Sequence, residues 1–462
     1  MLTYRTAVKP LVATTAYISL IIFTQNSAYA ATFTASNTNE LQAAIEQSNA
    51  LAGRDIIEIT PGIFELTSTL SITDSVGIIG AGADATTFTN GSNSFLAALF
   101  IDNTGTDPIA NVFGVAIRNF TGGAIFVDEG ASLSLSDSLV TENEFITGGV
   151  IQNSGFLQVF NSTISNNQGG ARGGGFANSG TLQLVNSTVS GNTSRIGAGI
   201  QNFGRGRLEV VNSTISGNIA EVGGGGILNL GNASIAYSTI TDNVANARNQ
   251  DFDATAVGGG INNIQGGTVN IGNTILAGNT DNREDPSNPN YSPDCFSQTR
   301  FRFTSFRGNL VGIANSNCNI GDTIFGGTRF DQVGTADDPI NPLLGSLANN
   351  GGSTLTHILL PGSPAIDRGN GITSASFFDC PSTDQRGAPR PFDGDSDGNA
   401  VCDVGAFEFG ASIPVEPSQP VPEPASTFGL FAFGALGVGS MLKRKQKQQQ
   451  SASRDIQNTR LT

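Results

Sequence analysis

Acidic residues occupy every second position in one short segment near the C-terminal end of the chain. Asp393, Asp395 and Asp397 alternate with small residues, and a glycine and Asn399 follow. Carboxylate and carboxamide oxygens at alternate positions of a loop, with glycine at the turn, are a common arrangement of ligands around Ca²⁺. The segment therefore predicts a Ca²⁺ site with five candidate ligands: Asp393, Asp395, Asp397, Asn399 and Asp403.

This loop differs from an EF-hand. Counted from Asp393, position twelve is Val404 rather than glutamate, and the sequence predicts no flanking helices. The alternative interpretation is an acidic turn that is only solvated. Three neighbouring carboxylates destabilise one another unless a cation is present, which favours the Ca²⁺ site.

Few residue types of this chain can carry catalysis. His357 is the single histidine, and no lysine occurs between residues 31 and 420. These absences exclude a histidine-rich zinc site and a Schiff-base mechanism, and they disfavour a Ser-His-Asp triad. Paired carboxylates are scarce because Glu209 and Glu221 are the only acids between residues 145 and 241. We predict no catalytic residue and interpret His357 as structural.

The charge balance limits the partners. Between residues 31 and 420 there are 36 Asp and Glu against 15 Arg, so this body of the chain has a net charge of −21. Such a surface repels nucleic acid and anionic lipid. Two polar insertions, near 246–255 and 280–308, mix acids, arginines and aromatic residues and are candidate glycan-binding loops. The alternative is a structural excursion held by a disulfide.

The N-terminal end indicates export. Arg5 and Lys9 accompany an apolar stretch, and Ala28 and Ala30 form a small-x-small cleavage pattern. These features are typical of a secretory signal peptide, so the mature chain is expected to begin near Ala31.

Four cysteines fit that compartment. An even number of cysteines in an exported chain indicates disulfides rather than a metal site. Three pairings are open, and proximity in the sequence favours Cys295–Cys318 and Cys380–Cys402.

A repeat organises the centre of the chain. Related triplets recur at steps of 24, 25, 26, 25 and 35 residues: Asp137-Ser138-Leu139, Asn161-Ser162-Thr163, Asn186-Ser187-Thr188, Asn212-Ser213-Thr214, Tyr237-Ser238-Thr239 and Gly272-Asn273-Thr274. A second marker keeps a similar rhythm: Asn153, Asn178, Asn202, Asn229 and Asn263. Each repeat adds a short alternating strand and a glycine-rich stretch, without helical periodicity.

Such repeats describe the coils of an all-β fold, a single-stranded right-handed parallel β-helix. Successive coils stack at ~4.8 Å, so a recurring residue lies directly above its own copy. A recurring asparagine is then expected to form a hydrogen-bonded ladder, and recurring aliphatic residues an internal column. The predicted column contains Ile164, Val189, Ile215, Ile240 and Ile275.

Residues 39–51 form the one convincing amphipathic helix of the body, which we predict to cap the open end of the solenoid. Strands are expected at 55–60 and 71–80. The stretch from Ser71 to Phe88, "SITDSVGIIGAGADATTF", resembles an early coil of pectin-lyase-like β-helices, and this resemblance covers residues 31–279. It implies the solenoid fold, and a polysaccharide lyase or glycoside hydrolase as one possible activity.

Three motifs follow the repeats: residues 349–367 (NNGGSTLTHILLPGSPAID), 384–387 (DQRG) and 402–408 (CDVGAFE). Together they resemble the choice-of-anchor Q domain over residues 341–409. The resemblance implies a small β/loop module that stands behind β-helix repeats and before a surface-anchoring signal.

The C-terminal end contains a sorting pattern. Pro422, Glu423 and Pro424 precede an apolar run (425–442) and a basic cluster (443–447). Eighteen uncharged residues are just long enough for one transmembrane helix, and the basic cluster is expected to stay cytoplasmic. The pattern resembles a PEP-CTERM tail, which implies recognition and cleavage by an exosortase-type peptidase. The chain departs from that pattern by continuing through 448–462, and a plain C-terminal membrane anchor is the alternative.

We therefore expect an exported, surface-sorted β-helix protein of adhesive or extracellular-matrix type that binds glycans. The alternative is an extracellular polysaccharide lyase or glycoside hydrolase. Ca²⁺ is the expected cofactor, and exosortase-type machinery and an extracellular polysaccharide are the expected partners. The expected organisation is a signal peptide (1–30), an N-terminal cap (31–55), the β-helix (56–340), the choice-of-anchor Q module (341–410), a linker (411–420), the sorting signal (421–447) and a polar tail (448–462).

Overall fold

The computed structural model describes residues 30–92, 94–246, 258–282, 293–299, 302–318, 320, 331–369 and 377–414. The predicted signal peptide and sorting signal, including Pro422, Glu423 and Pro424, lie outside these residues. Among the residues that are described, no helix is long and apolar enough to span a membrane. The described residues up to Ile413 belong to one compact unit.

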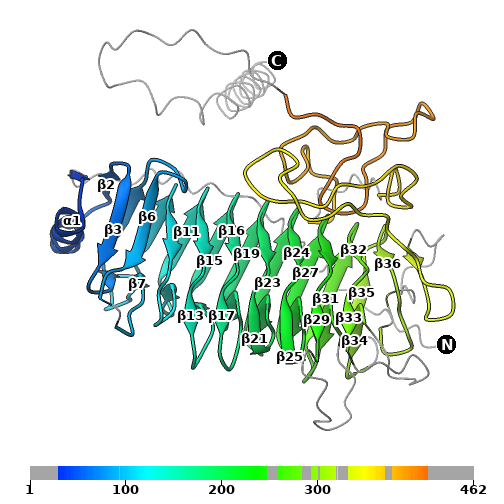
Figure 1. Ribbon diagram of the computed structural model, residues 1–462, viewed down its shortest axis with the longest axis horizontal. Helices are drawn as coiled ribbons and strands as arrows, with labels where there is room; N and C mark the ends of the chain where they lie inside the picture. Colours follow the sequence, from blue (N-terminus) through cyan, green and yellow to red (C-terminus); the bar gives the residue numbers. More distant parts are fainter. Residues whose placement is uncertain are drawn as a thin grey trace, which may run out of the picture. The chain divides into compact units, whose positions relative to one another are not determined.

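Short parallel strands build this unit (Figure 1). Each strand pairs in parallel with the equivalent strands of the neighbouring coils, so that four sheets run along the stack. A complete coil passes in chain order through sheets C, A, B and D, which are defined by their strands below. This arrangement confirms the predicted all-β parallel β-helix.

The strands of sheet A are β1 (Thr32–Ala35), β2 (Asp55–Ile59), β5 (Val76–Ile79), β8 (Ile109–Phe113), β11 (Ser132–Ser136), β15 (Phe156–Phe160), β19 (Thr181–Val185), β23 (Arg207–Val211), β27 (Asn232–Ala236), β31 (Thr268–Gly272) and β35 (Phe303–Ser305). The strands of sheet B are β3 (Gly62–Leu66), β6 (Thr86–Asn90), β9 (Ala116–Arg118), β12 (Leu139–Thr141), β16 (Thr163–Ser165), β20 (Thr188–Ser190), β24 (Thr214–Ser216), β28 (Thr239–Thr241), β32 (Ile275–Leu276), β36 (Leu310–Val311) and β37 (Gln332–Val333).

The strands of sheet C are β4 (Leu70–Ile72), β7 (Leu99–Ile101), β10 (Ile125–Val127), β14 (Ile151–Asn153), β18 (Phe176–Asn178), β22 (Ile200–Asn202), β26 (Ile227–Asn229), β30 (Ile261–Asn263) and β34 (Cys295–Ser297). Sheet D is formed by β13 (Glu144–Phe145), β17 (Gln168–Gly169), β21 (Thr193–Ile196), β25 (Ile219–Gly223), β29 (Val244–Ala245) and β33 (Thr280–Asp281).

The core is a set of stacked aliphatic columns. In a strand, alternate side chains point to opposite faces, and in β19 Leu182 and Leu184 are fully buried while their neighbours are half-buried. Leu157 and Val159 on β15 are their register partners. Because each coil repeats this alternation, the buried residues form one hydrophobic core along the solenoid.

Four of the five residues predicted for the aliphatic column in sheet B are confirmed, and the fifth is displaced by one residue. Its confirmed members are Ile164, Val189, Ile215 and Ile240. The next partner of Ile240 is Leu276, whereas Ile275 pairs with Thr239. The prediction for Ile275 was wrong by one residue because the preceding insertion obscured the register. A slip of one residue moves a side chain to the other face of the sheet, and Ile275 accordingly packs outside the solenoid core.

In the first five triplets the first residue forms the corner between sheets A and B; in the sixth the corner is Asn273, because Gly272 ends β31. Asn161, Asn186 and Asn212 have φ values of 48°, 50° and 53°, in the left-handed region. Asparagine tolerates this conformation better than most other residues with a side chain. The recurring asparagine is therefore explained first by the backbone of the corner.

A buried asparagine ladder joins sheet C to the turn before sheet A, as predicted. The side-chain Nδ2 of each asparagine donates to Oδ1 of its copy in the next coil at 2.7–2.8 Å. The members are Asn153, Asn178, Asn202, Asn229 and Asn263. The predicted ladder is thus confirmed.

A second, unpredicted ladder lies at the corner between sheets B and D. Its side chains are linked by hydrogen bonds of 2.9–3.0 Å, in the order Asn143, Asn167, Asn192, Asn218, Asn243, Asn279 and Asp294. Each Oδ1 also accepts from the backbone N–H of the preceding member, as Asn218 does from Asn192 at 3.0 Å. The ladder therefore satisfies buried backbone donors that no strand can reach.

The N-terminal helix α1 (Thr38–Ala50) buries Leu41, Ala44 and Ile45 against the first coil. Asn37 caps it by accepting from the backbone N–H of Glu40 at 3.0 Å. The range predicted as the cap, 31–55, also contains β1, which already pairs with β2 in sheet A.

Both predicted disulfides are present. Cys295 is bonded to Cys318 and Cys380 to Cys402, with Cα–Cα distances of 5.4 and 6.4 Å. Proximity in the sequence therefore selected the correct pairing among the three that were open.

Asp294, at the end of the second ladder, should make folding pH-dependent. Burial raises its pKa from 3.8 to about 6. A carboxyl whose folded pKa is raised contributes stability that is fully present below pH 3.8 and is lost as pH rises through about 6. Relative to Asp294→Asn, the wild-type protein should lose about 2 kcal/mol of unfolding free energy between pH 4 and pH 7. Denaturant unfolding at several pH values tests this, and a difference that stays constant with pH contradicts it.

Candidate functional site

The C-terminal module, residues 341–413, packs on the outer face of sheet B. Thr188 Oγ1 donates to the carbonyl of Leu355 at 2.7 Å, and Thr214 Oγ1 donates to Oε1 of Gln385 at 2.6 Å. Further along the stack, Ile275 packs in an apolar cluster with residues of the module. Thr188 and Thr214 are therefore buried docking groups for the module rather than solvated residues.

His357 belongs to this contact. Its Nε2 lies 2.8 Å from Ser216 Oγ and its Nδ1 lies 2.7 Å from the carbonyl of Gly345. With the proton on Nδ1, the ring donates to Gly345 and accepts from the serine hydroxyl. Burial lowers the pKa of His357, which favours the neutral ring. The structure thus places the single histidine in the contact between module and coils, with Asp242 Oδ2 4.0 Å from the same Nε2 that bonds Ser216. Its Nδ1 is bonded to a backbone carbonyl rather than to a carboxylate, unlike the histidine of a catalytic triad.

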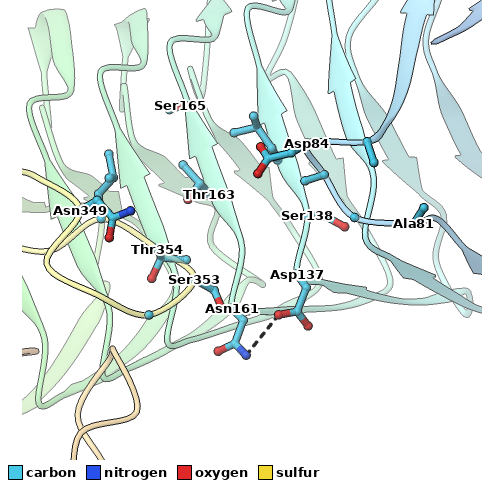
Figure 2. A pocket seen from close by; sticks show the side chains of 16 residues that line it. Ala81, Asp84, Asp137, Ser138, Asn161, Thr163, Ser165, Asn349, Ser353 and Thr354 are labelled. Atoms are coloured by element: carbon cyan, nitrogen blue, oxygen red, sulfur yellow. Dashed lines mark hydrogen bonds between the residues drawn. The ribbon is translucent and has the colours of Figure 1, made fainter. Parts of the chain in front are cut away.

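A cavity of about 580 Å³ lies beside the module, where the outer face of sheet B continues toward the N-terminus (Figure 2). Segments far apart in the sequence line it. One is the loop 81–85, the second consists of corner and sheet B residues of two coils, and the third is a module loop that includes Asn349 and Leu355. The cavity exists only because the module is docked.

The module wall of the cavity is fixed by hydrogen bonds. Thr354 Oγ1 donates to the carbonyl of Asn186 at 3.1 Å, and Gln385 Nε2 donates to Thr354 Oγ1 at 2.9 Å. The carbonyl of Leu355 receives a bond from Thr188, as described above. The lining is therefore held in place before any ligand arrives, which lowers the entropic cost of binding.

Acidic, amide and hydroxyl groups give the cavity its chemistry. Asp137 and Asn161 face each other at 3.5 Å across adjacent coils, and Asp84 is exposed in another part of the lining (Figure 2). Burial raises the pKa of the Asp137 carboxyl, and the hydrogen bond from Asn161 partly offsets this. None of the 16 lining residues is Arg, Lys or His. The cavity can accept hydrogen bonds from hydroxyl groups, but it offers no cation to an acidic ligand.

One feature of the sequence indicated a binding site at this cavity. Asp137 stands at the corner position where the next three triplets have asparagine, although both residues tolerate the left-handed backbone. A departure from the repeat without a conformational reason marks a position that can serve binding. The sequence could not predict the other walls of the cavity, because nothing in the repeat indicates that the loops at 81–85 and 349–355 meet.

The carboxylates that converge at the acidic loop differ from the predicted set. Carboxylate oxygens of Asp393, Asp395 and the unpredicted Asp367 lie within 4.8 Å of one another. Asp367 is positioned by backbone N–H groups of Gly394 and Asp395, which donate to its Oδ2 at 3.0 and 2.8 Å. Asp393 Oδ1 is buried and has no hydrogen-bond partner.

The other two predicted carboxylate ligands, Asp397 and Asp403, are not part of this cluster. Asp397 is exposed and accepts from the backbone N–H of Asn399 at 2.8 Å, so both residues shape an exposed turn. Asp403 is fully buried, and its oxygens accept from the backbone N–H groups of Asp367 and Phe409. Burial and the nearby Glu408 raise the pKa of Asp403 to about 7. Its role is to hold the module together.

The predicted insertions lie largely outside the described residues. In the described part, Asp281 is buried and accepts from Asn246 Nδ2 at 2.6 Å, and Asp294 ends the second ladder. Phe303 is a core residue of sheet A. These residues maintain the coils and do not form a binding surface.

Comparison with known proteins identifies the C-terminal sorting signal. The PEP-CTERM protein-sorting motif matches residues 420–445. Among solved structures, an alginate lyase from Paenibacillus sp. strain FPU-7 is similar at a TM-score of 0.32 and 14% identity, over 59% of this chain and 99% of that one. The curated proteins contain no match to the sequence.

These findings define the class of protein. The chain is a parallel β-solenoid that carries a PEP-CTERM sorting signal, which indicates export and C-terminal sorting at the membrane. The signal implies recognition by exosortase-type machinery.

Proposed function

We propose that this protein is displayed at the cell surface or in the extracellular matrix and binds neutral glycans in the cavity between its coils and its C-terminal module. The observation that carries the proposal is a preformed cavity of about 580 Å³ lined by carboxylate, carboxamide and hydroxyl groups without a basic residue. Sugar hydroxyls are donors to such groups, and a few convergent polar groups in a preformed cavity are typical of small-molecule sites.

The charge of the body supports a neutral ligand. Asp84 and Asp137 repel the carboxylates of an acidic polysaccharide, and the body carries a net charge of −21 from its 36 acids and 15 arginines. A uronate lyase needs a base and a group that neutralises the substrate carboxylate. The lining supplies no cation for the second task.

A glycoside hydrolase is the second candidate. The cavity contains two carboxylates in different environments, Asp137 half-buried and Asp84 exposed. Burial raises the pKa of Asp137, as is required of a general acid, while an exposed carboxylate suits a base or nucleophile. Binding without turnover and hydrolysis are separated by the experiment below.

We also propose a Ca²⁺ site at Asp367, Asp393 and Asp395. Support comes from the convergence of three carboxylates and from the buried, unpartnered Oδ1 of Asp393. A bound cation would satisfy that oxygen and offset the repulsion between the carboxylates. The site would tie the loop at 393–398 to Asp367 and so stabilise the module.

The sorting signal is proposed to be removed during display. Pro422 and Pro424 flank Glu423. Proline disfavours helix at its own and the preceding position, which suits a segment that a peptidase binds in extended form. Four glycines between residues 429 and 439 lower the apolar content of the following run, so it is a marginal permanent anchor.

Asp137→Gly should weaken binding of neutral oligosaccharides about tenfold, because it deletes a hydrogen-bonding carboxylate while keeping the left-handed corner. Glu142→Gly is the matched control, since it removes an exposed carboxylate from another left-handed position (φ 57°) that does not line the cavity. Titration calorimetry with neutral and acidic oligosaccharides gives the affinities, and chromatography of the products detects hydrolysis. Unchanged affinity in Asp137→Gly would remove the cavity as the binding site. Turnover that is lost in Asp137→Asn would establish the hydrolase instead.

Asp395→Asn should abolish stabilisation by Ca²⁺. Wild-type protein is expected to melt at a higher temperature in Ca²⁺ than in chelator, with a gain of about 2.7 kcal/mol at a concentration 100 times the Kd. Asp397→Asn removes a neighbouring exposed acid outside the cluster and should keep the gain. Calorimetry that shows equal midpoints for wild-type protein in both buffers rejects the site.

Glu423→Ala should leave the precursor in the membrane, whereas the surface form of the wild-type protein should lack residues 428–462. Glu416→Ala, an acid upstream of the triplet, serves as the control and should be processed normally. Mass spectrometry of the surface form measures the outcome. Recovery of intact 448–462 peptides from that form would mean that the segment is a permanent anchor.

A further inference from the structure

Four phenylalanines that do not line the cavity lie close together: two on the outer side of sheet C, one on β13 of sheet D and one in the segment before β7. Phe100 on β7 and Phe126 on β10 are register partners, with ring centroids 6.5 Å apart at 84°. Phe145 lies 5.6 Å from Phe126 at 90°, and Phe95 lies 5.6 Å from Phe145. We call this surface, formed by Phe95, Phe100, Phe126 and Phe145, the aromatic groove.

Phe145 also packs against the core, but Phe100 and Phe126 do not belong to it. In β7 and β10 the residues on either side of each phenylalanine are buried inside the solenoid, so Phe100 and Phe126 point outward. The same outward position is Ser71 in the coil before and Gln152 in the coil after. Phe95 is 62% exposed. Phe100, Phe126 and Phe145 are half-buried, so the four rings together form a partly exposed aromatic surface. Such a surface on an acidic, exported protein is typical of an interaction site.

The aromatic groove is a mixed surface rather than an apolar one. It borders a depression of about 420 Å³ in which Phe100 and Phe126 stand beside Ser71, Asp128 and Gln152. A sugar ring has the matching chemistry, because its C–H faces pack on aromatic rings while its edge hydroxyls bond carboxylates and amides. A hydrophobic protein partner would leave those polar groups unpaired.

We infer that the aromatic groove binds a neutral polysaccharide chain, as a second site that does not depend on the cavity. Ser71, Phe100, Phe126 and Gln152 belong to four successive coils in one register. Three strand spacings of ~4.8 Å give the row a length of roughly 14 Å along the solenoid, which exceeds a single sugar ring. The ligand is therefore an extended chain.

The charges of the protein favour a neutral polysaccharide over a second copy of the protein and over an acidic polysaccharide. A second copy of the protein would bring together two bodies that each carry a net charge of −21, from 36 acids and 15 arginines. An acidic polysaccharide would meet Asp128 in a depression whose lining contains no Arg, Lys or His. A neutral polysaccharide is repelled neither by the net charge of the body nor by Asp128.

The test uses full-length protein carrying Asp137→Gly, so that the cavity does not contribute. Titration with cellohexaose, a neutral oligosaccharide, should give saturable binding, and Phe126→Ala added to this protein should weaken it about tenfold. Phe113→Ala is the matched control, because Phe113 is 45% exposed on sheet A and lies outside the aromatic groove. Phe126→Tyr keeps the ring and should bind like the parent, which separates a stacking role from loss of folding. Thermal melts confirm that each variant folds.

Equal affinities of Phe126→Ala and Phe113→Ala overturn the inference. Equal binding of cellobiose and cellohexaose overturns the extended-chain ligand, and equal binding of an acidic oligosaccharide overturns the selection by charge. A protein that dimerises without glycan and becomes monomeric in Phe126→Ala has a second copy in the groove, which also overturns the inference. Failure of the Asp137→Gly experiment alone would reject the cavity and leave this site intact.

Discussion

Hydrogen bonding between equivalent groups of successive coils is the interaction on which the rest of this structure depends. Strands satisfy their backbone groups through parallel pairing, but the corners between sheets cannot. At the corner between sheets B and D, the backbone N–H of Asn192 and its own Nδ2 both donate to Oδ1 of Asn218. An unpaired buried donor costs about 1–3 kcal/mol, so one such side chain per coil fixes the path of the corner. The solenoid is held by these ladders as much as by its aliphatic columns.

This constraint separates positions that must repeat from positions that are free to differ. Inward residues and ladder residues must match the equivalent residues of neighbouring coils, whereas an outward residue has only to avoid a steric clash. The features with functional character are outward ones. Asp137 replaces a corner asparagine, and Phe100 and Phe126 stand between the polar residues Ser71 and Gln152 on sheet C. The threonines on sheet B repeat for a different reason, because several coils dock one module.

The module shows how a small loop-rich unit can be stable on such a surface. Among its described residues, strand pairing is limited to isolated bridges. Its order comes from the sheet B hydroxyls, the Cys380–Cys402 disulfide and buried side chains such as Asp403 that accept backbone N–H groups. In return the module covers Ile275 and closes one side of the cavity. Solenoid and module are therefore parts of one compact unit, although only the solenoid has repeats.

The sequence by itself determined the solenoid, the ladder through Asn153 and Asn263, and the two disulfides, because a stacked repeat converts spacing along the chain directly into position in space. It located the acidic loop at Asp393 but not its partner Asp367, which lies 26 residues earlier and is brought in by backbone hydrogen bonds. It misplaced Ile275 because an insertion breaks the correspondence between spacing and register. The cavity was decided by the tertiary structure alone. Its walls join residues more than 200 positions apart through docking of the module, a contact between non-equivalent surfaces for which the repeat contains no pattern.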